Sequence, residues 1–262
     1  MRGLLFFSFL MLCLVGNFAE ARVFNFSNNW VAAYIRGTGG LSNVDKDMYG
    51  KTSGNSTAFD KGVDYNFSGE IGFAILLSNN MTARLGIEGL QTKEVTVTGE
   101  SALGAKYMDV VSRAVVFNPG LTFEYSFRGT GTSRLYGFAG AGYSIVKITN
   151  AYELTAAGTT AYSGASASYT DNWYANAINY HVGTGWEAFL FDNLTFNLDV
   201  GWRQLDVSGF KYNSDATVVR GGGGVSVTEG TNVTNNNGRK PKLDLGGYFV
   251  GMTFKFYIPP LN

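Results

Sequence analysis

The stretch Asp64-Tyr-Asn-Phe-Ser-Gly-Glu-Ile-Gly-Phe-Ala-Ile-Leu-Leu-Ser78 places apolar and polar or small side chains at alternate positions. One face would carry Tyr65, Phe67, Ile71, Phe73, Ile75 and Leu77, and the other Asn66, Ser68, Glu70, Gly72 and Ala74. Because successive side chains of a β-strand point to opposite sides of its sheet, this period of two predicts a strand. A second alternating run follows the tight turn Ser78-Asn79-Asn80, so the two runs together predict a β-hairpin.

The same alternation recurs along the whole chain. In the second run, residues 81–88, Met81, Ala83, Leu85 and Ile87 oppose Thr82, Arg84, Gly86 and Glu88. Further strands are expected at residues 30–38, 121–127, 135–148, 174–188, 194–203 and 248–256. In the first of these we expect Val31, Ala33 and Ile35 to face outward and Arg36 inward. No composition shift interrupts the pattern, so residues 22–262 are interpreted as one all-β domain.

The connections between the eight expected strands alternate in length. Short connections lie at residues 78–80, 128–133 and 190–193, and long polar ones at 43–63, 98–106, 150–171 and 208–242. All long connections therefore leave the same end of the sheet. Long loops at one end and short turns at the other are typical of an antiparallel transmembrane β-barrel.

The bulk of the apolar face indicates which face points inward. A closed sheet of eight strands encloses a space just wide enough for side chains, and the aromatic face is too bulky to fit it. The polar face would then line the lumen and the aromatic face would meet lipid. The charges expected in the lumen are Glu70, Arg84, Glu88, Glu124, Glu187, Asp199, Arg203 and Lys255. They would form either a narrow ion path or a salt-bridge network that blocks the lumen, and the narrow interior favours the block.

The first residues predict export from the cytoplasm. A basic start at Arg2, an apolar run and the small residues of Ala19-Glu20-Ala21 predict a signal peptide over residues 1–21. The only cysteine, Cys13, lies within it, so the exported protein is expected to contain no disulfide. The formal net charge is zero, which gives no indication of a nucleic-acid partner.

Aromatic residues recur near the expected short turns and would form a girdle at one membrane interface, namely Phe127, Tyr136, Trp186, Phe189, Phe191 and Phe196. Residues 136–143 (YGFAGAGY), 180–187 (YHVGTGWE), 194–203 (LTFNLDVGWR) and 247–256 (GYFVGMTFKF) resemble eight-stranded bacterial outer-membrane barrels, in particular the OmpA-like barrel domain and the opacity-type surface proteins. The resemblance implies a fold and a membrane rather than an activity. Such chains usually end on an aromatic residue, whereas this one continues through Pro259-Pro260-Leu261-Asn262; either the assembly signal is internal or the tail modifies assembly.

Few residues suggest chemistry. His181 is the only histidine and is expected to face inward, but no Gly-x-Ser-x-Gly motif accompanies it. One histidine and no exported cysteine make a zinc or copper site unexpected, and we expect no cofactor. The run Gly221–Gly224 lacks the features of a phosphate-binding loop and is interpreted as a flexible linker.

We therefore expect a non-enzymatic outer-membrane surface protein that contributes to envelope structure and adhesion through four long extracellular loops. The alternatives are a narrow pore for ions or small solutes and, more remotely, a lipid-modifying enzyme. Expected partners are outer-membrane lipid and lipopolysaccharide, the barrel-assembly machinery and an extracellular ligand bound by the loops. The basic residues Arg239, Lys240 and Lys242 either contact lipopolysaccharide phosphates or form the solvated base of a loop.

Overall fold

The structure, a computed structural model, describes residues 31–41, 65–101, 103–191, 193–220, 223–234 and 240–258. The expected signal peptide with Cys13, the connection 43–63, Arg239 and the tail from Pro259 lie outside the described residues. Eight strands of a ten-stranded sheet form the barrel: β1 (Val31–Leu41), β2 (Tyr65–Ser78), β3 (Met81–Thr92), β5 (Lys106–Gly129), β6 (Ser133–Leu154), β7 (Ser168–Phe191), β8 (Leu194–Gln204) and β14 (Gly247–Ile258).

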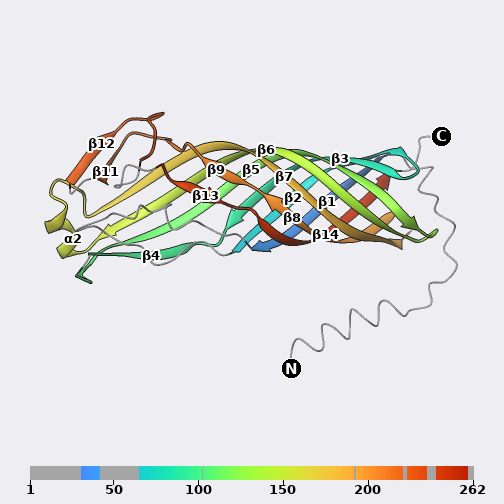
Figure 1. The fold of residues 1–262 in the computed structure, drawn as a ribbon, viewed down its shortest axis with the longest axis horizontal. Coiled ribbons are helices and arrows are strands. Elements are labelled where there is room, and N and C mark those ends of the chain that lie inside the picture. Colours follow the sequence, from blue (N-terminus) through green and yellow to red (C-terminus); the bar gives the residue numbers. More distant parts are fainter. Residues whose placement is uncertain are drawn as a thin grey trace, which may run out of the picture.

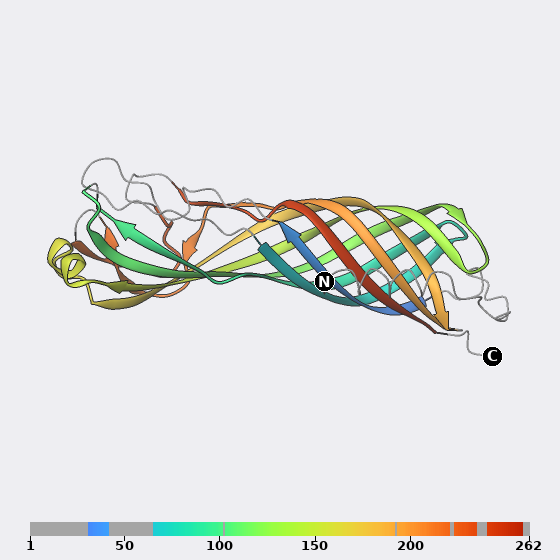
Figure 2. The same ribbon diagram turned by 90° about the horizontal axis from the view of Figure 1, so that it is seen from below.

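These eight strands close into a ring. Neighbours in the chain pair antiparallel, and the last strand, β14, pairs with β1 on one side and with β8 on the other. The β7–β8 pairing, with Gly183 opposite Gly201, leaves no open edge within the ring. The predicted eight-stranded antiparallel barrel is thus confirmed, and its tilted strands are seen in Figures 1 and 2.

The outer surface of the ring is apolar, as the alternation predicted. In β2, Phe67, Ile71 and Phe73 are 61%, 64% and 55% exposed, whereas Asn66 and Ala74 are buried. The other strands show the same outward set of large apolar side chains, including Leu85, Ile87, Phe123, Tyr125, Ile178, Val200, Met252 and Phe256. A continuous exposed belt of this kind is stable only against lipid, so the barrel spans a membrane. Among the described residues no helix is long and apolar enough to cross a bilayer.

Three strands are much longer than a membrane requires. β5, β6 and β7 have 24, 22 and 24 residues, and a tilted strand crosses the hydrocarbon layer in about 9–11 residues. Their excess length forms an extension beyond the barrel, visible in Figure 1 at the end opposite the β2–β3 turn. We call this extension the head; it comprises the described parts of 93–116, 146–175 and 205–245.

Short elements complete the head. They are β4 (Val95–Glu100), α2 (Ala156–Ala161), β9 (Asp206–Ser208), β10 (Lys211–Tyr212), β11 (Ala216–Arg220), β12 (Gly223–Val227) and β13 (Lys242–Asp244). β4 pairs with β5, β10 with β7, β9 with β13, and β11 with β12. The helix α2 and the β11–β12 hairpin lie at the far end of the molecule (Figure 1).

The prediction of long loops at 150–171 and 208–242 is therefore wrong in part. The ends of β6 and β7 and the helix α2 occupy much of the first range, and β10, β11 and β12 occupy much of the second. The prediction of a flexible linker at Gly221–Gly224 is also wrong for Gly223 and Gly224, which pair with Arg220 and Val219; residues 221–222 are not described. The pairing of β5, β6 and β7 continues beyond the membrane because their inward apolar side chains are buried there in a second hydrophobic core.

That core lies inside the head. Val110, Ala114 and Val116 on β5 face Val146 and Ile148 on β6 in one buried cluster, which Trp173, Leu205, Phe210 and Leu243 complete. Further along β5 the inward positions become polar, at Asn118, Thr122 and Glu124. One strand face thus lines an apolar core in the head and a charged lumen in the barrel.

Candidate functional site

The charged lumen is the most distinctive site of the barrel. The structure places all eight predicted side chains on the inward faces of their strands: Glu70, Arg84, Glu88, Glu124, Glu187, Asp199, Arg203 and Lys255. Seven of them are buried, and the side chain of Glu70 is 12% exposed. Three layers of contacts connect them along the barrel.

The layer nearest the short turns centres on Glu124. Lys255 Nζ lies 3.0 Å from a Glu124 oxygen and 3.1 Å from a Glu187 oxygen. Arg134 bridges the same two carboxylates, with Nη2 3.0 Å from Glu124. Arg84 adds a further ion pair through Nε, 3.2 Å from Glu124. Three cations from three strands therefore surround one carboxylate.

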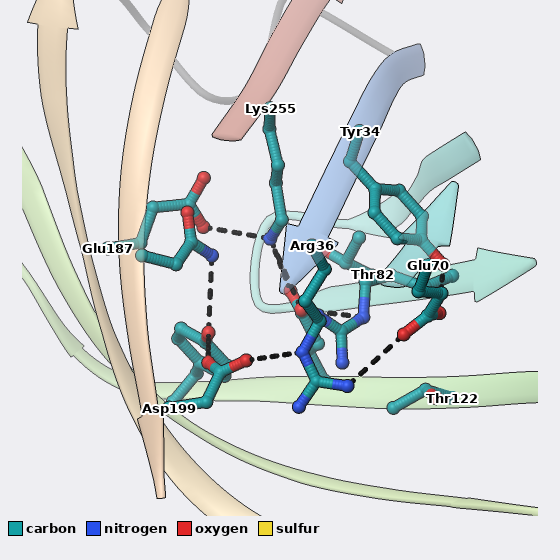
Figure 3. Close-up of polar contacts among 12 residues, drawn as sticks. Tyr34, Arg36, Glu70, Thr82, Thr122, Glu187, Asp199 and Lys255 are labelled. Carbon is teal, nitrogen blue, oxygen red and sulfur yellow. Dashed lines mark hydrogen bonds and ion pairs between the residues drawn. The ribbon is translucent and has the colours of Figure 1, made fainter. Parts of the chain in front are cut away.

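The middle layer centres on Arg36 of β1, which contacts its cross-strand partner on β2 and a residue of β8, one strand beyond β14 (Figure 3). Its Nε lies 3.0 Å from Asp199 and its Nη1 lies 3.1 Å from Glu70. Two tyrosine hydroxyls complete the layer, since Tyr34 donates to Glu70 and Tyr136 donates to Asp199. Both carboxylates are thus held by a cation and a neutral donor.

The layer nearest the head combines one ion pair with amides. Arg203 Nη2 lies 2.5 Å from Glu88, and Asn118 Nδ2 donates to the other oxygen of Glu88 at 3.0 Å. Ser144 donates to Asn118 at 3.3 Å, and Asn179 donates to Ser144 at 3.2 Å. Beyond this layer the interior becomes the apolar core of the head.

The described lumen is electrically balanced. Its five cations are Arg36, Arg84, Arg134, Arg203 and Lys255, and its five anions are Glu70, Glu88, Glu124, Glu187 and Asp199. Aromatic rings contribute as well, because the Arg84 guanidinium lies 5.7 Å from the ring centre of Tyr34 and 5.8 Å from that of Phe138. A buried charge is costly unless it is paired, and this arrangement pairs each one.

Glycines on the inward faces make room for these large side chains. A Cβ on Gly86 would lie 2.1 Å from the Tyr34 hydroxyl, and one on Gly183 would lie 2.4 Å from the Phe138 ring. On Gly140 it would lie 2.4 Å from His181 Nε2. The missing side chains let rings and long cations fill the narrow interior, so the lumen is packed rather than hollow.

His181 belongs to this packing. Its Nε2 lies 2.8 Å from the Thr122 hydroxyl, and its ring lies 6.2 Å from that of Phe138. His181 also lies opposite Arg203 in the β7–β8 pairing, and its ring occupies the space above Gly140.

Arg134 and Tyr136 are among the network residues that were not predicted as such. Tyr136 was assigned to the outer aromatic girdle, and this is wrong because its side chain is completely buried in the lumen. Phe127 and Phe191 of the same predicted girdle are exposed, by 59% and 71%. The glycines and alanines from Gly137 to Gly142 hide the alternation of β6; counting alternate positions back from the polar Ser144 would have placed both residues inward.

A closed ring thus carries apolar side chains outside and balanced charges inside. The fold is that of the eight-stranded outer-membrane barrels. No family model matches the chain, and no curated protein sequence matches it. Solved structures with a similar fold include the outer membrane protein OprG from Pseudomonas aeruginosa, with 17% identity, 89% of this chain and 99% of that chain covered, and a TM-score of 0.43.

Two further solved structures are similar to this chain at comparable sequence identity and TM-score. A major outer membrane protein from Thermus thermophilus has 12% identity, covering 86% of this chain and 99% of its own, with a TM-score of 0.44. Ail, the attachment invasion locus protein of Yersinia pestis, has 12% identity, covering 87% and 99%, with a TM-score of 0.37. The assignment of the barrel rests on the ring and its two faces.

Proposed function

We propose that this chain is a non-enzymatic protein of the bacterial outer membrane whose barrel anchors and whose head contacts partners outside the cell. The observation that supports the proposal is the packed interior. The five ion-paired cations and five anions fill the barrel, and the apolar core fills the head above them. Function then belongs to the outer surface, where a rigid scaffold displays irregular segments.

The tip of the head is a fixed surface rather than a set of loose loops. Thr155 N donates to Tyr107 O at 2.9 Å and ties α2 to β5. The β11–β12 hairpin is tied on through Gly224, whose N donates to Ser163 O at 3.2 Å. Leu103, in the β4–β5 turn, is 97% exposed. Such an apolar residue on an ordered surface is a suitable contact point for a partner.

The first test is conductance of the refolded full chain in a planar bilayer, with folding checked by the gel mobility of the unheated sample. A blocked lumen predicts folded protein that carries no current steps. Steady steps that Arg36→Ala alters would instead favour the narrow pore and contradict the blocked interior.

The second test measures adherence of cells that display the full chain, on surfaces coated with extracellular-matrix proteins and on cultured epithelial cells. We expect Leu103→Ser combined with Val225→Ser to lower adherence severalfold at equal surface expression. Phe127→Ser is the matched control, because it changes an exposed apolar residue at the opposite end of the barrel. Equal adherence of the wild type and a strain without the protein would contradict adhesion.

A further inference from the structure

The lipid-facing surface of the barrel has an apolar groove above a row of glycines. Gly72 pairs with Gly86, Gly86 with Gly120, and Gly120 with Gly142, so four adjacent strands have a glycine at the same level. The groove along this row has a volume of about 1010 Å³. Its walls are outward apolar side chains such as Ile71, Leu85, Leu121, Tyr143 and Ile178.

A row of basic side chains runs parallel to the groove. Across the strands, Gln91 pairs with Val115, Val115 with Lys147, Lys147 with Tyr174 and Tyr174 with Lys211. Arg113 lies two residues beyond Val115 on the same face and donates to Gln91 Oε1 at 2.7 Å. Arg113, Lys147 and Lys211 are all exposed and point away from the core of the head.

No carboxylate of the described residues forms an ion pair with these three cations. Along the chain the nearest carboxylates are Asp109, four residues from Arg113, and Asp215, four residues from Lys211. The carboxylate of Asp215 accepts a hydrogen bond from the backbone amide of Glu229. Asp109, further along β5, is paired with Lys106 at 2.6 Å. The row therefore carries a net positive charge on a surface adjacent to the membrane.

The spacing between the two features matches the depth of a lipid leaflet. Gln91, Val115 and Lys147 each lie five residues beyond the glycine of their own strand, at Gly86, Gly120 and Gly142. At about 3.3 Å per residue this is about 17 Å along the strand, and less in height because the strands tilt. Half of a hydrocarbon core of about 30 Å is about 15 Å. Outward Phe117 and Ile145 keep the path between them apolar.

We propose that the basic row and the groove together bind a phosphorylated lipid of the outer leaflet. Arg113, Lys147 and Lys211 hold the phosphate groups by charge-assisted hydrogen bonds, and the groove holds an acyl chain against the apolar walls. Binding would set the height and rotation of the barrel in the membrane. The site is independent of whether the head recognises a partner outside the cell.

The test uses the refolded full chain in bilayers that contain equal amounts of lipid A with two phosphates and its dephosphorylated form. Native mass spectrometry then reports which lipid stays bound. We expect the wild type to retain the phosphorylated form at least tenfold over the other, and R113Q/K147Q/K211Q to lose this preference. The double variant K106Q/R128Q removes two exposed charges outside the row and should behave as the wild type.

A groove variant tests the acyl-chain half separately. Ala141 is an exposed groove residue, so Ala141→Trp should fill the groove and reduce retention of both lipids severalfold. Ala139→Trp, two residues away on the same outward face and outside the groove, is the matched control. Equal retention of both lipids by the wild type would overturn the proposal. Displacement of the lipid by inorganic phosphate, together with unchanged binding by Ala141→Trp, would also overturn it and indicate a site for free phosphate.

Discussion

Lys255 is fully buried between Glu124 and Glu187, at 3.0 and 3.1 Å from their oxygens. A charge in this position is stable only through its partners, because removing one member of a buried ion pair leaves the other uncompensated. The charge balance of the lumen therefore depends on all of its ion-paired residues together. Replacing one charged residue should destabilise the fold more than replacing a cation and its partner anion at once.

We expect Lys255→Met to lower the free energy of unfolding by about 3–5 kcal/mol. Glu124→Gln should also be destabilising, since Arg84 and Arg134 would lose a partner. The double variant should be less destabilised than the sum of the two, because it removes one charge of each sign. Urea unfolding in lipid vesicles, followed by tryptophan fluorescence, measures this coupling. Strictly additive effects would contradict a coupled network.

Asp109 shows how an ion pair in the head responds to pH. The hydrogen bond from Lys106, followed by one from Thr98, holds the pKa of Asp109 below its ordinary value. Because the folded pKa is lowered, the contribution to stability is present above the ordinary pKa of an aspartate and is lost as pH falls through the lowered one. Lys106→Gln should raise the pKa of Asp109, as a carboxyl NMR titration would report. Lys147→Gln is the control and should leave that titration unchanged.

At the scale of single elements, the helix α2 depends on one close approach. A Cβ on Gly158 would lie 2.0 Å from the carbonyl oxygen of Tyr107 on β5, so only glycine allows the helix to pack at this distance. Tyr107 also packs edge-on against Tyr162, with ring centres 5.7 Å apart. The contact fixes the tip of the head to the end of a barrel strand.

Gly158→Ala should therefore displace α2, at a cost of about 1–3 kcal/mol. The expected signature is faster hydrogen exchange at the amides of Thr159 and Tyr162, which donate to Thr155 and Gly158, with barrel exchange unchanged. Gly131→Ala, where a Cβ meets nothing within 4 Å, is the control. Unchanged protection in α2 would show that the helix tolerates the shift.

At the scale of the whole molecule, the two ends of the barrel should lie on opposite sides of the membrane. Leu103 lies in the β4–β5 turn of the head, and Gly131 in the exposed turn between β5 and β6 at the other end. Since Cys13 is the only cysteine of the chain, single cysteines introduced at these positions report their own accessibility.

On intact cells, Leu103→Cys should react with a membrane-impermeant maleimide, whereas Gly131→Cys should react only after the outer membrane is permeabilised. The unsubstituted chain sets the background. Labelling of Gly131→Cys on intact cells would reverse the orientation and place the head in the periplasm.

The period-two alternation of the chain determined the number of barrel strands, their order along the chain and the face that meets lipid. Each strand face is set by its own residues, as in Phe67, Ile71 and Phe73 against Asn66 and Ala74. It also identified eight of the lumen charges, because a charged residue at an inward position of a strand must point into the lumen. Tyr136 was misassigned since the glycines and alanines after it carry no apolar or polar signal.

Only the tertiary structure decided which charges meet and what becomes of the long connections. Arg36 and Asp199 are 163 positions apart, and their contact depends on the register of β14 against β1 and against β8, which closes the ring. The head was likewise hidden, because Val110, Val146 and Leu205 form a core only after strands distant in sequence are aligned. Local alternation specifies a strand and its faces, whereas pairing across the barrel is a property of the closed sheet.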